Sequence, residues 1–167
     1  MFSIYNLMEI LYNDLMYEQR LVSYIDEDGL QHYANNFPEI LRKNRISIKI
    51  EGMERFGRSY FEYGKKLANQ YGHEGPVTCH LFYAKEHSPS FGMHTDPDDV
   101  IIHCVEGKKT MIIEDVYTVI EPGEEVYIPR GTLHQALNEY EALTLSYGLE
   151  RFIEDKLNEL DVLPQNN

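Results

Sequence analysis

Hydrophobic residues change their spacing near the middle of the chain. Up to about residue 72 they recur every three or four residues in two stretches, which predicts amphipathic helices over about residues 3–18 and 53–71. Between these stretches, Ile46, Ile48 and Ile50 alternate with Ser47 and Lys49, as in a half-buried strand. The helical stripes are most simply packing faces, formed by Ile4, Leu7, Met8, Leu11 and Leu15 in the first helix and by Phe56, Tyr60, Tyr63, Leu67 and Tyr71 in the second.

After Gly72 the pattern consists of short apolar runs separated by proline, glycine and acidic turns, such as Glu121-Pro122-Gly123. So many short strands in one region indicate a jelly roll or a small barrel. A last helix over about residues 150–160 is expected to pack through Ile153, Leu157 and Leu160, and residues 164–167 form a frayed tail. The predicted strands lie near residues 77–84, 91–95, 100–105, 109–114, 117–120, 125–128, 134–138 and 143–149.

The chain length suits one domain, because a chain of 167 residues buries roughly 70% of its unfolded surface. No internal repeat, low-complexity segment or linker divides it. We therefore expect one mainly β domain over residues 1–167. It consists of a helical N-terminal cover (1–75), a jelly-roll barrel (77–149) and a short C-terminal helix (150–160).

Cysteine usage and the N-terminus both favour a cytoplasmic, intracellular protein. Cys79 and Cys104 lie in apolar runs without CxxC spacing, which predicts buried reduced thiols. The first basic residue is Arg20, and Glu9 and Asp14 interrupt the apolar N-terminus. Neither a signal peptide nor a membrane span fits this pattern.

The net charge of −13 opposes binding to nucleic acid, because such binding depends on many basic residues. The basic cluster at residues 42–45 is interpreted as a solvated turn. Overall acidity slightly favours a basic peptide or protein over nucleic acid as a partner. The sequence does not indicate the oligomeric state.

Three residues carry the candidate chemistry. In a strand, residues two apart point to the same side, so His94 and Asp96 are placed to bind one ion. His134 follows a Pro-x-Gly turn and supplies a second imidazole. Two histidines and one carboxylate form the ligand set of non-heme Fe(II) oxygenases, which leaves metal positions open for substrates. The remaining histidines lack a spaced partner: His80 and His103 are interpreted as ordinary structural residues, and His32, His73 and His87 as exposed.

Two motifs resemble those of known families. The pattern Gly123-x5-Pro129-x-Gly131-x2-His134-x3-Asn138 matches the second motif of the cupin superfamily. The first segment, His94-x-Asp96, differs from the common cupin His-x-His. It resembles the JmjC-like cupins, which are 2-oxoglutarate oxygenases that include asparaginyl and ribosomal-protein hydroxylases. The likeness covers about residues 77–150.

The resemblance implies a double-stranded β-helix and a specific activity. His94, Asp96 and His134 would bind Fe(II), and O2 with the cosubstrate 2-oxoglutarate would hydroxylate a protein side chain or a small amino-acid-like molecule, giving succinate and CO2. Lys109, fifteen residues after the first histidine, would pair with the distal carboxylate of 2-oxoglutarate, and the hydroxyls of Thr144 and Ser146 would help to bind it. Strand alternation also places the Lys109 ammonium on an apolar face, where it needs an anion.

Two alternatives remain open. Phe91 and Val100 stand where many relatives carry a Thr or Ser and an Asn that bind 2-oxoglutarate. This difference favours a metal-binding cupin of another class, such as an isomerase or an oxygenase that does not use 2-oxoglutarate. A third possibility is a non-catalytic cupin binding module, which would be favoured if the three ligand side chains lay more than about 6 Å apart.

Overall fold

Strands dominate the fold, as the sequence predicted. A computed structural model describes residues 4–161, and the side chains of residues 6–158. The strands are β1 (Val22–Ile25), β2 (Gln31–Tyr33), β3 (Ser47–Ile50), β4 (Val77–Ala84), β5 (Asp99–Gly107), β6 (Lys109–Ile113), β7 (Val116–Ile120), β8 (Glu125–Ile128), β9 (His134–Ala136) and β10 (Ala142–Leu149). The helices are α1 (Ile4–Leu11), α2 (Asp14–Glu18), α3 (Phe37–Leu41), α4 (Met53–Phe56), α5 (Arg58–Gln70) and α6 (Ile153–Asp161).

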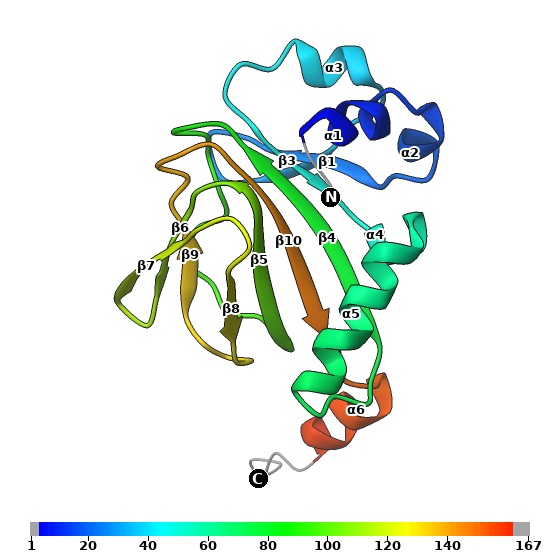
Figure 1. The fold of residues 1–167 in the computed structure, drawn as a ribbon, viewed down its shortest axis with the longest axis vertical. Helices are drawn as coiled ribbons and strands as arrows, with labels where there is room; N and C mark the ends of the chain where they lie inside the picture. The colour runs from blue at the N-terminus through cyan, green and yellow to red at the C-terminus, as the bar shows by residue number, and fades with distance from the viewer. Residues whose placement is uncertain (1–3, 162–167) are drawn as a thin grey trace, which may run out of the picture.

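The strands within residues 4–161 form two antiparallel sheets. The large sheet has seven strands in the order β2-β1-β3-β4-β10-β5-β8, and the small sheet has three in the order β7-β6-β9. The small sheet lies on one side of β5 and β10, and α5 runs along β4 on the other side (Figure 1). This arrangement is consistent with a jelly-roll β-sandwich and confirms the predicted fold class.

Alternating side chains of the central strands divide the core into two clusters. On the helical side, Leu81, Ile101 and Tyr147 pack with residues of α1, α4 and α5 and are fully buried. On the other side, Val100, Ile102 and Cys104 of β5 pack against Met111, Ile120 and Ile128. The second face is the one turned toward the small sheet, so the residues that point there are candidates for a site.

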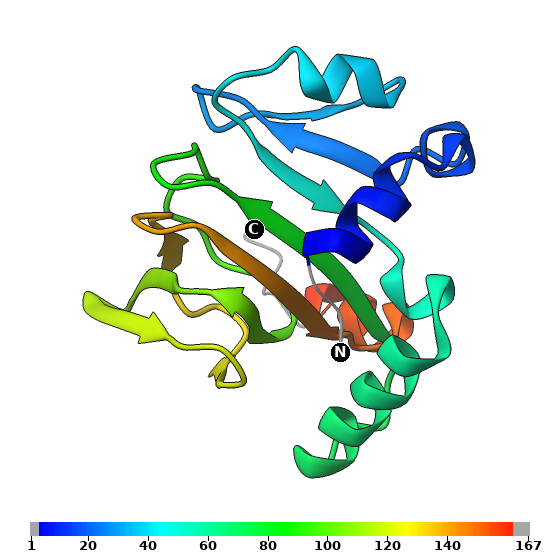
Figure 2. The same cartoon turned by 45° about the horizontal axis from the view of Figure 1, so that its top comes forward.

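The expectation of a helical cover over residues 1–75 needs correction. β1, β2 and β3 belong to this region and extend the large sheet through β4 (Figure 2). Residues of β1 and β3 and residues of the barrel strands share one hydrophobic cluster, so the two parts pack together. The sequence pattern revealed only β3, because β1 is buried at all four positions and lacks the alternation of a half-buried strand. The single domain over residues 1–167 remains a prediction.

Both predicted N-terminal helices are interrupted. The first breaks between α1 and α2 at Asn13, whose side chain accepts a hydrogen bond from the Leu15 backbone N–H and caps α2. The break leaves Leu15 exposed rather than on the packing stripe, and the side chain of Ile4 lies outside the described residues. The second breaks at Gly57, between α4 and α5. Short-range periodicity continues across such breaks, which explains why the sequence did not reveal them.

The C-terminal helix is present, but the prediction of its packing face was wrong. Ile153 and Leu157 are exposed, and the side chain of Leu160 and the predicted tail at residues 164–167 lie outside the described residues. Polar contacts instead attach α6, through Lys156, to Asp98. Within residues 4–161, no helix is long and apolar enough to cross a membrane. The cluster at residues 42–45 is exposed, as expected of a solvated turn.

Candidate metal centre

The segment before β5 carries two of the candidate ligands. We expected a strand at residues 91–95, and this was wrong: the structure has only an isolated bridge, between His94 and His134. Their backbones exchange two hydrogen bonds, with N–O distances of 3.0 and 2.9 Å. The Gly131 N–H donates to the Asp96 carbonyl at 2.9 Å. The segment is thus attached to the Pro129-x-Gly131 turn and β9 at the positions of its ligands.

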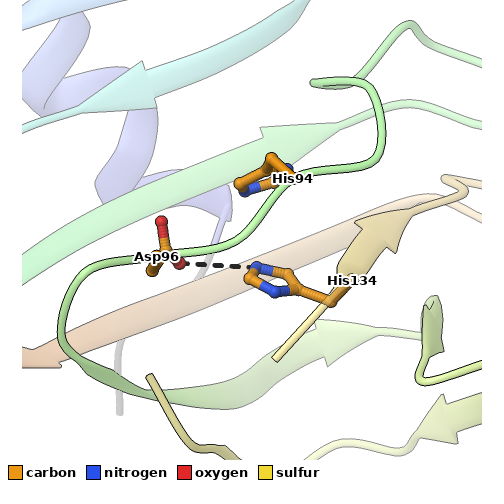
Figure 3. Close-up of side chains that lie close together, drawn as sticks. All are labelled: His94, Asp96 and His134. Atoms are coloured by element: carbon orange, nitrogen blue, oxygen red, sulfur yellow. Dashed lines mark ion pairs between the residues drawn. The ribbon is translucent and has the colours of Figure 1, made fainter. Parts of the chain in front are cut away.

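The three ligand side chains converge on one point (Figure 3). One ligand atom from each of His94, Asp96 and His134 lies within 4.8 Å of the others. His134 Nε2 is 3.4 Å from Asp96 Oδ2. Metal–ligand bonds are about 2.0–2.2 Å long, so small side-chain rotations bring all three atoms to one ion. Among the described residues, no other histidine, cysteine or acidic group joins such a cluster.

Backbone carbonyls fix the orientation of both imidazoles. His94 Nδ1 lies 2.7 Å from the Gly92 carbonyl oxygen, and His134 Nδ1 lies 2.9 Å from that of Thr132. A carbonyl oxygen only accepts, so each Nδ1 carries a proton, and each Nε2 has a free lone pair when its ring is neutral. Metal-binding histidines are commonly oriented by a hydrogen bond of this kind. The structure therefore presents two Nε2 atoms ready to coordinate.

Electrostatics keep the carboxylate charged. The hydrogen bond from His134 lowers the pKa of Asp96 below its ordinary value. The same hydrogen bond raises the pKa of His134, so metal binding must displace a proton that this ring holds more firmly than usual. An ionised carboxylate next to two oriented imidazoles is the donor set that suits Fe(II) with open coordination positions.

Acidic residues just after the ligands anchor the segment. Asp98 is 8% exposed and accepts hydrogen bonds from the Arg151 backbone N–H at 3.0 Å and from the Lys156 ammonium. Asp99 Oδ1 accepts from the Arg130 backbone N–H at 2.8 Å. These contacts tie the ligand segment to α6 and to the turn before His134.

A cavity of about 300 Å³ opens between the sheets beside the three ligands. Lys109, Thr144 and Ser146, which the sequence predicted to bind a cosubstrate, all line it together with His94, Asp96 and His134. Thr144 and Ser146 are 2% and 9% exposed and share one face of β10. The tertiary structure thus brings every predicted site residue to one cavity.

Lys109 is the most unusual charged residue of the cavity wall. It is 7% exposed, and its Nζ donates a hydrogen bond to Asn138 Oδ1 at 2.9 Å. Burial lowers its pKa to about 8. A neutral amide does not balance a buried charge, so this position favours an anionic ligand.

Two cavity residues bear on the alternatives. Phe91 and Val100 both line the cavity, so the positions that differ from many relatives are in contact with the site. Val100 continues into an apolar patch with Ile102 and Met111. The cavity wall beside the three candidate ligands is therefore more apolar than the resemblance implied.

Sequence reasoning missed three cavity residues. Asn138 was part of the cupin motif but had no assigned role, and it orients Lys109. Lys49 was assigned to the polar face of a half-buried strand, and that face lines the cavity. His80 was interpreted as an ordinary structural histidine, yet it also lies on the wall. The alternating polar positions of β3 and β4 were the available signal, but alternation alone does not tell solvent from a cavity.

Comparison with known proteins shows which family the second half of the chain resembles. The family described as Cupin domain matches residues 80–147, and no curated protein matches the chain. This match confirms the predicted resemblance: residues 80–147 are similar to the cupin domain.

Among solved structures, the chain is similar to YcfD, a ribosomal oxygenase from Escherichia coli in complex with cobalt and succinic acid. The TM-score is 0.68 at 16% identity, and the match covers 99% of this chain and 50% of that chain. A cupin superfamily protein from Desulfitobacterium hafniense matches over 45% of this chain and 68% of its own, with 16% identity and a TM-score of 0.42. At 16% identity the similarity to YcfD concerns the fold alone.

Proposed function

We propose that this protein is an Fe(II)- and 2-oxoglutarate-dependent dioxygenase that hydroxylates a protein side chain or a small amino-acid-like substrate. The observation that carries the proposal is the convergence of His94, Asp96 and His134 within 4.8 Å, beside a cavity with a buried lysine. The fold shared with YcfD, an oxygenase whose structure contains cobalt and succinic acid, is compatible with this function.

The residues of the chain fit the cofactor and the cosubstrate. Two Nε2 atoms and an ionised carboxylate would hold Fe(II) on one face and leave the other face open. Lys109, supported by Thr144 and Ser146, would bind the distal carboxylate of 2-oxoglutarate. When both are bound, O2 oxidises 2-oxoglutarate to succinate and CO2 and hydroxylates the substrate.

The strand geometry fits a ligand that bridges the metal and Lys109. β9 pairs with β6 so that His134 lies opposite Ile113 and Ala136 opposite Met111. Asn138, which follows two residues later, holds the Lys109 side chain. Asn138 and His134 are four residues apart in the sequence, and both line the cavity. The apolar wall of Val100, Ile102 and Met111 between them limits the access of water.

The test is spectroscopic. Anaerobic protein with Fe(II) and 2-oxoglutarate is expected to show the metal-to-ligand absorption band of such complexes, and His134→Ala is expected to abolish it. His32→Ala is the matched control, because His32 is an exposed histidine on β2. No band in the wild type, or an unchanged band in His134→Ala, would contradict the proposal. Mass-spectrometric detection of succinate across a panel of peptides and amino acids would then search for the substrate.

A second candidate is a metal-binding cupin of another reaction class, such as an isomerase or an oxygenase that does not use 2-oxoglutarate. Phe91 and Val100 on the cavity wall favour it, because they leave fewer hydrogen bonds for 2-oxoglutarate. Lys109→Ala separates the two candidates. The dioxygenase requires that this variant bind 2-oxoglutarate much more weakly and retain the metal, whereas the alternative requires little change in either. A non-catalytic binding module is disfavoured, because the ligand atoms lie closer than the separation of about 6 Å that would support it.

The two unpaired thiols support an intracellular location. Cys79 and Cys104 are free and buried, and burial raises the pKa of each. Buried thiols of this kind are unreactive structural residues.

A further inference from the structure

Two lysines face the cavity from different strands. Lys109 of β6 contacts Asn138, whereas Lys49 of β3 lines the same cavity as the metal-ligand candidate Asp96. In the proposed function, one carboxylate of 2-oxoglutarate binds the metal and the other binds Lys109. Lys49 is therefore a second cation in the cavity for which the cosubstrate has no carboxylate left.

Lys49 is held in place by an ion pair that does not use all of its hydrogen-bond donors. Its side chain is 14% exposed, and its Nζ is 2.8 Å from Glu51 Oε1. Gln31 also donates to Glu51 Oε1, at 3.3 Å. Glu51 itself is not among the residues that line the cavity. An ammonium has three N–H donors, and the bond to Glu51 uses one. The remaining donors are available to a ligand in the cavity. Lys49 Nζ lies over the ring of Phe82, 6.0 Å from the ring centroid.

His80 is a polar residue of the same wall that lacks a protein partner. Its Nδ1 is buried and has no hydrogen-bond partner among the described residues. Leaving such an atom unpaired costs about 1–3 kcal/mol. The ring itself lines the cavity. Burial and the nearby charge of Lys49 lower the pKa of His80, so the ring is neutral at pH 7 and offers one N–H donor.

The strand register places these two residues within reach of one ligand. Lys49 lies opposite Phe82, and His80 lies two residues along β4 from Phe82, on the same face. Such diagonal neighbours are about 7–8 Å apart, which long side chains bridge. His80 also lies opposite Ser146 of β10, the hydroxyl proposed to contact 2-oxoglutarate. The pair thus extends from the cosubstrate position on β10, across β4, to β3.

We propose that Lys49 and His80 form a substrate subsite that binds a carboxylate, so that the substrate is an acidic molecule or an acidic side chain. The subsite rests on the proposed function for its role in catalysis, although its binding chemistry does not require turnover. It reverses the expectation of a basic partner, because Lys49, and not the net charge of the surface, would meet the substrate. The small cavity suits one side chain or a small acid.

Binding of defined probes tests the subsite on metal-free protein, by calorimetry. The probes are aspartate blocked at both ends, its asparagine counterpart and free aspartate. Blocked aspartate is expected to bind at least about tenfold more tightly than blocked asparagine, because a charge-assisted hydrogen bond is roughly twice as strong as a neutral one. Tighter binding of blocked than of free aspartate would indicate a side chain of a peptide, and the reverse would indicate a small acid. Equal binding of blocked aspartate and asparagine overturns the proposal.

Variants assign the effect to the two residues. Lys49→Met is expected to lose the preference for aspartate, Lys49→Arg to retain it, and Lys85→Met, an exposed control, to leave it unchanged. His80→Leu is expected to weaken probe binding and to raise the melting temperature, because it removes an unpaired buried atom. A structural histidine would instead lower the melting temperature, and that result together with unchanged probe binding overturns the role of His80.

The outcomes also separate this inference from the proposed function. When 2-oxoglutarate is added to the anaerobic Fe(II) protein, the absorption band is expected to reach half of its final intensity at the same 2-oxoglutarate concentration in Lys49→Met as in wild type. If Lys49→Met weakens the binding of 2-oxoglutarate and not the binding of the aspartate probe, Lys49 belongs to the cosubstrate site and the inference fails. If wild type never forms the band but binds blocked aspartate through Lys49, the dioxygenase fails and the carboxylate subsite stands.

Discussion

His94 and His134, which are 40 positions apart in the sequence, are joined by two backbone hydrogen bonds of 3.0 and 2.9 Å. This bridge holds the segment before β5 against β9 and turns both imidazoles toward Asp96 (Figure 3). A metal site built on paired backbone is more precise than one built on a free loop. Substitutions that disturb the backbone near the bridge are therefore expected to affect metal affinity as well as stability.

Gly131 offers a test of this coupling. It adopts a φ of +76°, and its N–H donates to the Asp96 carbonyl. A Cβ there would meet no atom within 4 Å, so Gly131→Ala is expected to cost only backbone strain, about 1–2 kcal/mol of unfolding free energy. The affinity for Co(II), measured by absorption, is expected to fall together with the unfolding free energy. Gly123→Ala is the control, because Gly123 also has free space and a positive φ, but its N–H donates to Cys104 and not to the ligand segment; an equal fall in Co(II) affinity in both variants would argue against the coupling.

Binding of 2-oxoglutarate is expected to weaken at alkaline pH. Burial lowers the pKa of Lys109 to about 8, so the ligand-free protein loses this positive charge above that pH. The affinity of the Co(II)-loaded protein for 2-oxoglutarate should be constant below about pH 8 and fall by up to about tenfold per pH unit above it. Lys109→Arg should give a flat profile over the same range, because a guanidinium stays protonated. Identical slopes for the two proteins would show that another group controls the titration.

Asn138 is expected to be essential for stability. Its side chain is 2% exposed, and besides accepting from Lys109 its Nδ2 lies 3.2 Å from Ser47 Oγ, the Ser88 carbonyl and the Pro89 carbonyl. Asn138→Ala removes these partners at a position with a φ of +51°, and should lower the unfolding free energy by about 2–4 kcal/mol in urea. Asn44→Ala, at an exposed position, should change it by less than about 0.5 kcal/mol.

Asp98 is expected to connect α6 to the metal site. Burial acts to raise its pKa, but the hydrogen bonds from Lys156 and the Arg151 backbone outweigh this and lower it below 3.8. Asp98→Asn should therefore lower stability at neutral pH, and the difference from wild type should shrink as the pH falls through the depressed pKa. Metal affinity should also fall, because the segment holding Asp96 loses an anchor. Asp155→Asn, exposed on α6, is the control; similar pH profiles for both variants would contradict this role.

The predictions from sequence were most accurate where structure depends on neighbouring residues. Apolar runs and turn residues placed β4, β5, β6, β7, β8, β9 and β10 within a few residues of their observed bounds. The predictions failed where a long-range contact decides the outcome. The segment around His94 is not a strand of a sheet, because its backbone pairs with one residue of β9. The next hydrogen bond, from the Gly131 N–H to the Asp96 carbonyl, attaches it to the turn before β9. β1 gave no clear pattern, because burial on both faces removes alternation. β2 is only three residues long.

The sequence by itself determined the mainly β fold and the identity of the three candidate ligands, because periodicity, turn chemistry and motif spacing are local properties of the chain. It also placed Lys109 on an apolar face. Only the tertiary structure decided that this lysine, Lys49 and His80 share a cavity with those ligands. The reason is physical: alternation separates the two faces of a strand, but packing of the second sheet decides which face encloses a site and which meets water.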